Sequence, residues 1–282
     1  MQVVVAKTAG FCFGVNRAVE MAYKLLDEGK SVSMYGPIIH NPHVIEDMKN
    51  RGADIVDDFD SIKKERTLLI RAHGIERKTE EKIKKEKIEY LDATCPFVRK
   101  IHKIVSENSS KDILTLIAGD ENHPEVKGIR SYAKGESIVF KTSDELEKIL
   151  SQLPHVGKKQ LILVAQTTFS IKDWEKCKKI INKVCTNQKI FDTICFATEE
   201  RQSEAVTLSL SCDAMLIIGG RESSNTYKLK KVCEQNCPTY LVEDVSELEK
   251  IDLSQFKKIG ITAGASTPVC IIKEVNDYVR KF

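Results

Sequence analysis

The chain has 282 residues, of which 41% are hydrophobic, and this composition suits a globular protein with well-formed cores. Its 44 Lys and Arg residues nearly balance 41 Asp and Glu residues, so the net charge of +3 argues against a nucleic-acid-binding protein. No segment approaches the ~20 apolar residues of a membrane span, and the N-terminus lacks the features of a signal peptide. The nine cysteines lack disulfide-framework spacing, which predicts a reducing, cytoplasmic compartment.

Short runs rich in Val, Ile and Leu alternate with longer amphipathic segments along the chain. The runs predict strands at Val3–Ala6, Ser31–Tyr35, Thr67–Ile70, Ile88–Leu91, Ile113–Ala118, Ile138–Phe140, Leu161–Val164, Lys189–Phe191, Ala214–Ile218, Thr239–Val242 and Ile259–Thr262. One long helix is expected to carry Val15 on its apolar stripe and stop at Gly29, and another to run from about Ser170 to Val184. This alternation predicts an α/β fold with mainly parallel sheets built from βαβ units.

Three cysteines are each followed by a glycine and then by a small polar residue at the same two distances, 24 and 28 residues. The three sets are Cys12, Gly36 and His40; Cys95, Gly119 and His123; and Cys195, Gly219 and Ser223. A looser third step of 61 or 71 residues leads to His73, Gln166 and Ser266. The pattern predicts one supersecondary unit repeated in three pseudo-equivalent lobes, which would bring three thiols to one axis.

Each of these cysteines follows a predicted strand and precedes a predicted helix. Asp92 stands three residues before Cys95, and Asp192 stands three residues before Cys195, so the two turns share a sequence pattern. In open α/β sheets, ligands bind at the carboxyl ends of the strands. The repeated polar residues are therefore expected to gather at that end of each sheet.

Three thiolates from separate turns, without a Cys-x-x-Cys pair, do not suit structural zinc, which prefers four protein ligands. They suit a [4Fe–4S] cluster in which one iron keeps no protein ligand and can bind a substrate oxygen as a Lewis acid.

The repeated polar residues and their neighbours are hydrogen-bond donors at predicted loop–helix junctions, where free backbone N–H groups and the helix dipole favour a phosphate or diphosphate. These residues are His40, His73, His123, Ser223, Ser224, Asn225 and Ser266. Glu125 and the pair Thr167–Thr168 are the candidates for moving protons.

The other cysteines and histidines are expected to have structural roles. Cys177, Cys185, Cys212 and Cys270 border or join apolar segments and are predicted to be core residues. Cys233 and Cys237 are four residues apart on a predicted helix, so a metal pair is geometrically possible, although core packing is favoured. The residues expected at the surface or in helix caps are His43, His102 and His155.

Seven segments between residues 10 and 268, in order, resemble the motif set of the 4-hydroxy-3-methylbut-2-enyl diphosphate reductase (LytB/IspH) family. They are Gly10–Val15, Ala72–Gly74, Asp92–Pro96, His123–Val126, Gln166–Thr168, Ser223–Asn225 and Thr262–Ser266. The resemblance implies three α/β lobes, residues 13–94, 95–194 and 195–282, around a central iron–sulfur cluster. It also implies that the N-terminal strand, within residues 1–12, completes the third lobe. One departure is Arg221–Glu222, where Lys or Ser would be expected.

The resemblance further implies the last step of the methylerythritol phosphate route to isoprenoids. In that step the hydroxyl of an allylic diphosphate is removed reductively, which gives isopentenyl and dimethylallyl diphosphates. Carried over, Cys12, Cys95 and Cys195 would hold one [4Fe–4S] cluster, and Glu125, Thr167 and His123 would be catalytic. The substrate-binding residues would be His40, His73, His123, Thr167, Ser223, Ser224, Asn225 and Ser266.

No Gly-x-Gly-x-x-Gly motif follows a predicted strand, so we expect a separate ferredoxin or flavodoxin as electron donor, and a monomeric enzyme. Two other functions remain open from the residues alone. An aconitase-like hydratase would use the open iron without a reductant. An iron–sulfur sensor or assembly protein would need no diphosphate site.

Overall fold

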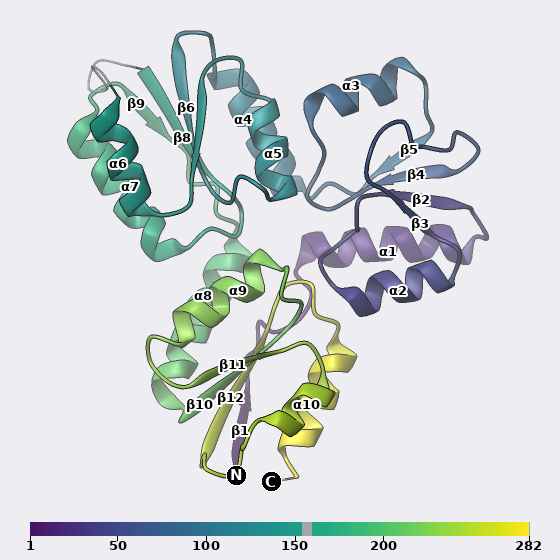
Figure 1. Cartoon of the computed structure of the whole chain (residues 1–282), viewed down its shortest axis with the longest axis vertical. Helices are drawn as coiled ribbons and strands as arrows, with labels where there is room; N and C mark the ends of the chain where they lie inside the picture. The colour runs from purple at the N-terminus through teal and green to yellow at the C-terminus, as the bar shows by residue number, and fades with distance from the viewer. Residues whose placement is uncertain (154–159, 282) are drawn as a thin grey trace. The chain divides into compact units, whose positions relative to one another are not determined.

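The computed structural model of the chain describes residues 1–153 and 160–281 and contains three four-stranded parallel sheets (Figure 1). The chain divides into two compact units. The first comprises residues 1–27, 39–53 and the segment from Phe196 onward, and the second comprises residues 28–38 and 54–195. Among the described helices, none has the length and apolar character that crossing a bilayer requires.

The first unit is built on a sheet in which the N-terminal strand lies at one edge. In spatial order its strands are β1 (Gln2–Val5), β12 (Lys258–Ala263), β10 (Ala214–Ile218) and β11 (Thr239–Val242). Its helices are α1 (Phe13–Asp27), α2 (Pro42–Asn50), α8 (Phe196–Ser211), α9 (Ser224–Cys233) and α10 (Val269–Val279), with a 3₁₀ helix at Val245–Lys250. Leu216 and Ile218 pack with α10, whereas Met215 and Ile217 pack with α8 and α9, so helices cover both faces of β10.

The second unit contains the other two sheets. The first of these has the order β3 (Asp54–Val56), β2 (Val32–Tyr35), β4 (Thr67–Ile70) and β5 (Tyr90–Asp92), with helix α3 (Arg77–Lys85). The second has the order β7 (Ser137–Phe140), β6 (Ile113–Ala118), β8 (Gln160–Ala165) and β9 (Gln188–Ile190). Its helices are α4 (Pro96–Asn108), α5 (Pro124–Ser131), α6 (Ser143–Gln152) and α7 (Ile171–Val184).

The central strands β6 and β8 are buried on both faces. Leu114 and Leu116 of β6 pack with α6 and α7, whereas Ile117 packs with α4 and α5. Two-sided burial explains why these strands are nearly continuous apolar runs in the sequence, without polar alternation.

The three sheets share one strand order. Each sheet has at one edge the strand that is followed in the sequence by one of the three cysteines. Beside this strand lie, in spatial order, the last, the first and the second of the other three strands, counted along the chain. The sets are β1-β12-β10-β11, β5-β4-β2-β3 and β9-β8-β6-β7. The predicted α/β fold with parallel sheets and a threefold repeated unit is confirmed, while the limits of the three lobes stay a prediction.

Most predicted elements occur within one or two residues of their expected bounds. The first long helix ends at Asp27, and Gly29 adopts the left-handed backbone (φ +72°) that glycine tolerates best. The second predicted helix occurs at Ile171–Val184, with Ser170 as its N-cap. Strand β3 was not predicted, because its three residues Asp54–Val56 are too few to show periodicity.

Candidate active site

Each cysteine of the repeated pattern immediately precedes a helix: Cys12 precedes α1, Cys95 precedes α4 and Cys195 precedes α8. In all three turns the cysteine N–H donates a hydrogen bond to a backbone carbonyl just beyond a neighbouring strand. The donor–acceptor distances are 3.3 Å from Cys12 N to Ala265 O, 2.9 Å from Cys95 N to Ala72 O, and 3.1 Å from Cys195 N to Thr167 O. The three thiols therefore occupy the same local position in their respective sheets.

These hydrogen bonds correct the sequence alignment of the repeats. The residues that follow the acceptor carbonyls are His73, Thr168 and Ser266, so Thr168 corresponds to His73, and the 71-residue step to Gln166 is wrong. Gln166 has another role, since its side-chain oxygen accepts a hydrogen bond from the N–H of Asp120 at 3.2 Å. Each acceptor carbonyl stands two residues after the last residue of its strand, so the difference in spacing between repeats arises before the end of β8 and not in the loop after it.

The thiols at these turns suit an iron–sulfur centre. All nine cysteines lie in the described part of the chain, and no disulfide joins any two of them. Cys12, Cys95 and Cys195 are partly exposed. Cysteine sulfur is the ligand that holds iron–sulfur clusters.

Glu125 and Thr167 form the most deeply buried polar pair of the candidate site. The Glu125 side chain is 2% exposed and accepts hydrogen bonds from Thr167 N at 2.6 Å and from Thr167 Oγ1 at 2.8 Å. Burial raises the pKa of Glu125 to about 7, and the two donors of Thr167 oppose that rise. A carboxyl with this pKa can both hold and release a proton near neutral pH.

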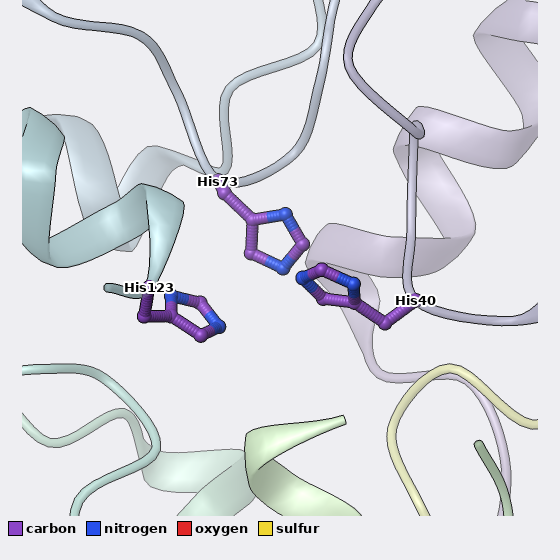
Figure 2. Close-up of side chains that lie close together, drawn as sticks. All are labelled: His40, His73 and His123. Atoms are coloured by element: carbon purple, nitrogen blue, oxygen red, sulfur yellow. The ribbon is translucent and has the colours of Figure 1, made fainter. Parts of the chain in front are cut away.

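His123 caps the helix that carries Glu125. The Glu125 N–H donates to Nδ1 of His123 at 3.2 Å, so the N–H of a neutral His123 lies on Nε2. His73, on the loop after β4, meets His123 edge to face with the ring centroids 5.1 Å apart (Figure 2). The second unit thus brings together His73, His123, Glu125 and Thr167.

The first unit brings together a separate group of predicted site residues around the start of α9. Ser223 is the N-cap of α9 and accepts a hydrogen bond from Thr226 N at 3.3 Å. The Asn225 side chain is 5% exposed, and its Nδ2 has no hydrogen-bond partner among the described residues. Ser266 Oγ donates to the His40 carbonyl at 3.0 Å. An unsatisfied buried donor at a helix N-terminus is the arrangement that an anionic ligand completes.

Comparison with known proteins agrees with this geometry. The family model described as "LytB protein" matches residues 3–280. A protein from a Nitratiruptor species, "4-hydroxy-3-methylbut-2-enyl diphosphate reductase", is 42% identical over 100% of this chain and 99% of its own. A protein of the same name from Caldanaerobacter subterraneus subsp. tengcongensis is 40% identical over 99% of this chain and 97% of its own. The chain belongs to the LytB family.

Two solved structures of reductases are also similar to this LytB-family chain. The E-1-hydroxy-2-methyl-but-2-enyl-4-diphosphate reductase from Plasmodium falciparum has a TM-score of 0.87 at 29% identity, over 99% of this chain and 87% of its own. The structure of (E)-4-hydroxy-3-methyl-but-2-enyl diphosphate reductase, the terminal enzyme of the non-mevalonate pathway, has a TM-score of 0.68 at 35% identity and covers both chains fully. Family membership makes this chain an iron–sulfur enzyme.

Outside the LytB motifs, the predictions for His102 and Cys270 were wrong. His102, expected at the surface, is 6% exposed and stacks on Tyr132 with ring centroids 4.4 Å apart. Gly74 and Gly128 leave room for its ring, because a Cβ on either glycine would lie 2.9 Å or 3.1 Å from an imidazole atom. Cys270, expected in the core, is exposed at the second position of α10.

Most predictions for the remaining cysteines and histidines hold. Buried side chains are found at Cys177, Cys185, Cys212 and Cys233. Cys237 is partly buried beside Cys212 and Cys233, but it lies beyond the end of α9 at Cys233, so the prediction that Cys233 and Cys237 share a helix was wrong. His43 is half exposed and pairs with Asp244 at 3.4 Å. His155 lies outside the described residues.

The sequence analysis missed the residues that hold the Cys12 loop of this LytB-family chain. Nη1 of buried Arg201 donates to the carbonyls of Gly10 at 2.8 Å and Ala263 at 2.7 Å. One turn further along α8, Glu204 accepts from Lys7 N, Thr8 N and Thr8 Oγ1 at 2.6–2.9 Å. The only indication of this role in the sequence was that Arg201, a charged residue, lies on the same helix face as the apolar residue Ala205.

Replacing Arg201 by Met is expected to destabilise the protein by about 2–4 kcal/mol, because two buried carbonyls lose a charged donor. Urea unfolding measures the stability, and hydrogen exchange of residues 7–12 should accelerate. Arg130→Met is the control, since the exposed Arg130–Glu121 pair should contribute at most about 1 kcal/mol. Unchanged exchange at residues 7–12 in the Arg201 variant would contradict the assigned role.

Glu125→Gln is expected to stabilise the protein more as the pH rises. The pKa of Glu125 is raised from 4.5 to about 7 on folding, so the folded state binds more protons between these values and wild-type stability falls across this range. The loss amounts to roughly 3 kcal/mol, and the amide variant lacks it. Urea midpoints at about pH 5 and about pH 8 test this, with Glu89→Gln, an exposed residue, as control. A stability difference independent of pH would argue against the raised pKa.

Proposed function

We propose that this chain is a 4-hydroxy-3-methylbut-2-enyl diphosphate reductase, an iron–sulfur oxidoreductase that takes electrons from a separate carrier protein. It removes the substrate hydroxyl and gives isopentenyl and dimethylallyl diphosphates, the last step of the methylerythritol phosphate pathway. The observation that carries the proposal is the buried Glu125–Thr167 pair in a chain that matches the LytB family over residues 3–280. The reaction consumes two electrons and two protons, breaks one C–O bond and releases water.

Cys12, Cys95 and Cys195 hold one [4Fe–4S] cluster, and one iron keeps no protein ligand. The support is their shared position, each before a helix N-terminus and each tied by its N–H to a strand-end carbonyl. When bound, the cluster supplies electrons and a Lewis-acidic iron.

The diphosphate is held by uncharged and imidazole donors at helix N-termini. Asn225 supplies a buried amide N–H₂ that has no partner among the described residues, and the first turn of α9 adds backbone N–H groups. His123 stands at the corresponding place before α5. The full set is His40, His73, His123, Thr167, Ser223, Ser224, Asn225 and Ser266.

Glu125 and Thr167 move the proton that the leaving hydroxyl needs. In the ionised state the Thr167 hydroxyl donates to Glu125 Oε2. When Glu125 is protonated, its carboxyl donates to Thr167 Oγ1 instead, and the Thr167 hydroxyl is then free to donate to the substrate oxygen. The pKa of about 7 lets Glu125 take up its next proton at neutral pH.

The electrons come from a ferredoxin or flavodoxin, since no dinucleotide-binding motif follows any strand. The enzyme acts as a monomer in the cytoplasm.

The Thr167 hydroxyl can be tested with a matched pair of variants. Thr167→Val keeps the shape and removes the hydroxyl, so turnover should fall about 10²-fold or more, as should that of Glu125→Gln. Thr167→Ser keeps the hydroxyl and should retain activity within a few-fold. Turnover is measured with a reduced viologen dye. Near-normal multiple turnover in Glu125→Gln would refute its role as acid.

The cluster ligands are tested by counting iron and acid-labile sulfide in protein purified without oxygen. We expect about four of each per chain, with a sharp fall in Cys95→Ser because one of three ligands is lost. Cys270→Ser is the matched control, since Cys270 is exposed on α10. Iron content that ignores Cys95, or zinc in place of iron, would overturn the proposed ligand set.

A further inference from the structure

The first unit has an open groove along β11, the edge strand of its sheet. We define the β11 groove by six of its ten lining residues, the charged and aromatic ones: Arg221, Tyr227, Lys230, Tyr240, Glu247 and Lys250. Its volume is about 530 Å³. The residues come from the loop before α9, from α9, from β11 and from the 3₁₀ helix, and the proposed substrate set includes none of them.

The β11 groove is cationic. Three of its lining side chains are cations, and Glu247 is the only carboxylate among the six residues that define it. Nη2 of Arg221 pairs with Glu247 Oε1 at 2.7 Å. Lys230 and Lys250 have no ion-pair partner among the described residues, which leaves two positive charges for a partner to match.

The groove also presents aromatic surface. Tyr227 is 49% exposed, and Tyr240 lines the groove from β11. Tyrosine and arginine side chains are enriched where proteins dock on one another.

A continuous series of contacts within the first unit leads from this groove to Cys12. Arg221 follows Gly220, whose Cα is so close to the His40 carbonyl that a Cβ would lie 3.1 Å from that oxygen. The His40 carbonyl accepts the hydrogen bond from Ser266 Oγ, and the adjacent Ala265 carbonyl accepts from Cys12 N. The groove therefore lies at the surface end of a short packed path to a proposed cluster ligand.

We propose that the β11 groove is the docking surface for the electron donor, a small electron-transfer protein with an acidic surface. The proposal rests on the proposed function for the need for a donor, because each turnover takes up two electrons that this chain does not itself generate. Two reduced one-electron carriers are oxidised, the substrate C–O bond breaks, and two protons are taken up as water forms. Acidic side chains of the carrier face Lys230 and Lys250, which steers the encounter electrostatically.

The test uses the double variant Lys230→Glu/Lys250→Glu and a purified acidic ferredoxin as probe. Binding of the oxidised ferredoxin to the holoenzyme is measured calorimetrically at low and at moderate salt. We expect binding about tenfold weaker or more in the variant, with the loss shrinking as salt screens the charges. KM for reduced ferredoxin should rise in parallel. Turnover driven by a reduced viologen dye should stay unchanged, because a small dye needs no docking surface.

The matched control is Lys176→Glu/Lys179→Glu, which makes the same change in net charge on the exposed face of α7. Tyr227→Ala is a second variant that keeps the charge, and it should also weaken ferredoxin binding. Equal weakening in the groove and control variants, or unchanged binding in the groove variants, would overturn the proposal. Absence of dye-driven turnover in the wild-type enzyme would instead count against the reductase function, so the two failures are distinguishable.

Discussion

The candidate site depends on a backbone hydrogen bond that recurs at three strand–helix turns. At each turn a cysteine N–H donates to a carbonyl just beyond a neighbouring core strand, which ties the start of the next helix to the carboxyl end of its sheet. The cysteine side chain is then presented beside N–H groups that the helix leaves unpaired. Because parallel strands all end at the same edge, the polar residues of the following loops are delivered to that edge as well. This hydrogen bond, repeated at the same point of the same topology, therefore explains where most of the candidate site residues lie.

The buried carboxyl of Glu125 shows how the fold sets the pKa of a proton-transfer group. Burial favours the neutral acid, whereas the N–H and hydroxyl of Thr167 favour the carboxylate. A fully exposed glutamate would be ionised at neutral pH and would have no proton to give, and an apolar pocket without donors would hold the proton too firmly. The two donors moderate the effect of burial, so both protonation states are accessible near pH 7.

The sequence predicted every strand except β3, the parallel α/β class and the repeated cysteine turns, because each follows from local apolar runs and regular spacing. The sequence-based predictions failed for residues whose surroundings are determined by tertiary packing. The step to Gln166 was misassigned because the stretch between the repeated cysteine and the end of the third strand differs in length between repeats. His102 is buried because two glycines leave room for its ring, which stacks on Tyr132. Arg201 was missed because its acceptors, such as the Gly10 carbonyl, are backbone atoms far away in the sequence. No sequence pattern predicts which distant backbone carbonyl a side chain will contact.

Helix α9 combines two ways of attracting negative charge that suit different tasks. Its N-terminus offers buried, uncharged donors such as Asn225, which bind an anion closely and cost little electrostatic free energy to bury when empty. Its outer face offers the formal charge of Lys230 in the open β11 groove, where water and salt weaken each contact. Buried, uncharged donors therefore suit a substrate that must be held through a reaction. Solvent-exposed, charged side chains suit a protein partner that must bind quickly and dissociate again, which an electron carrier does twice in each turnover.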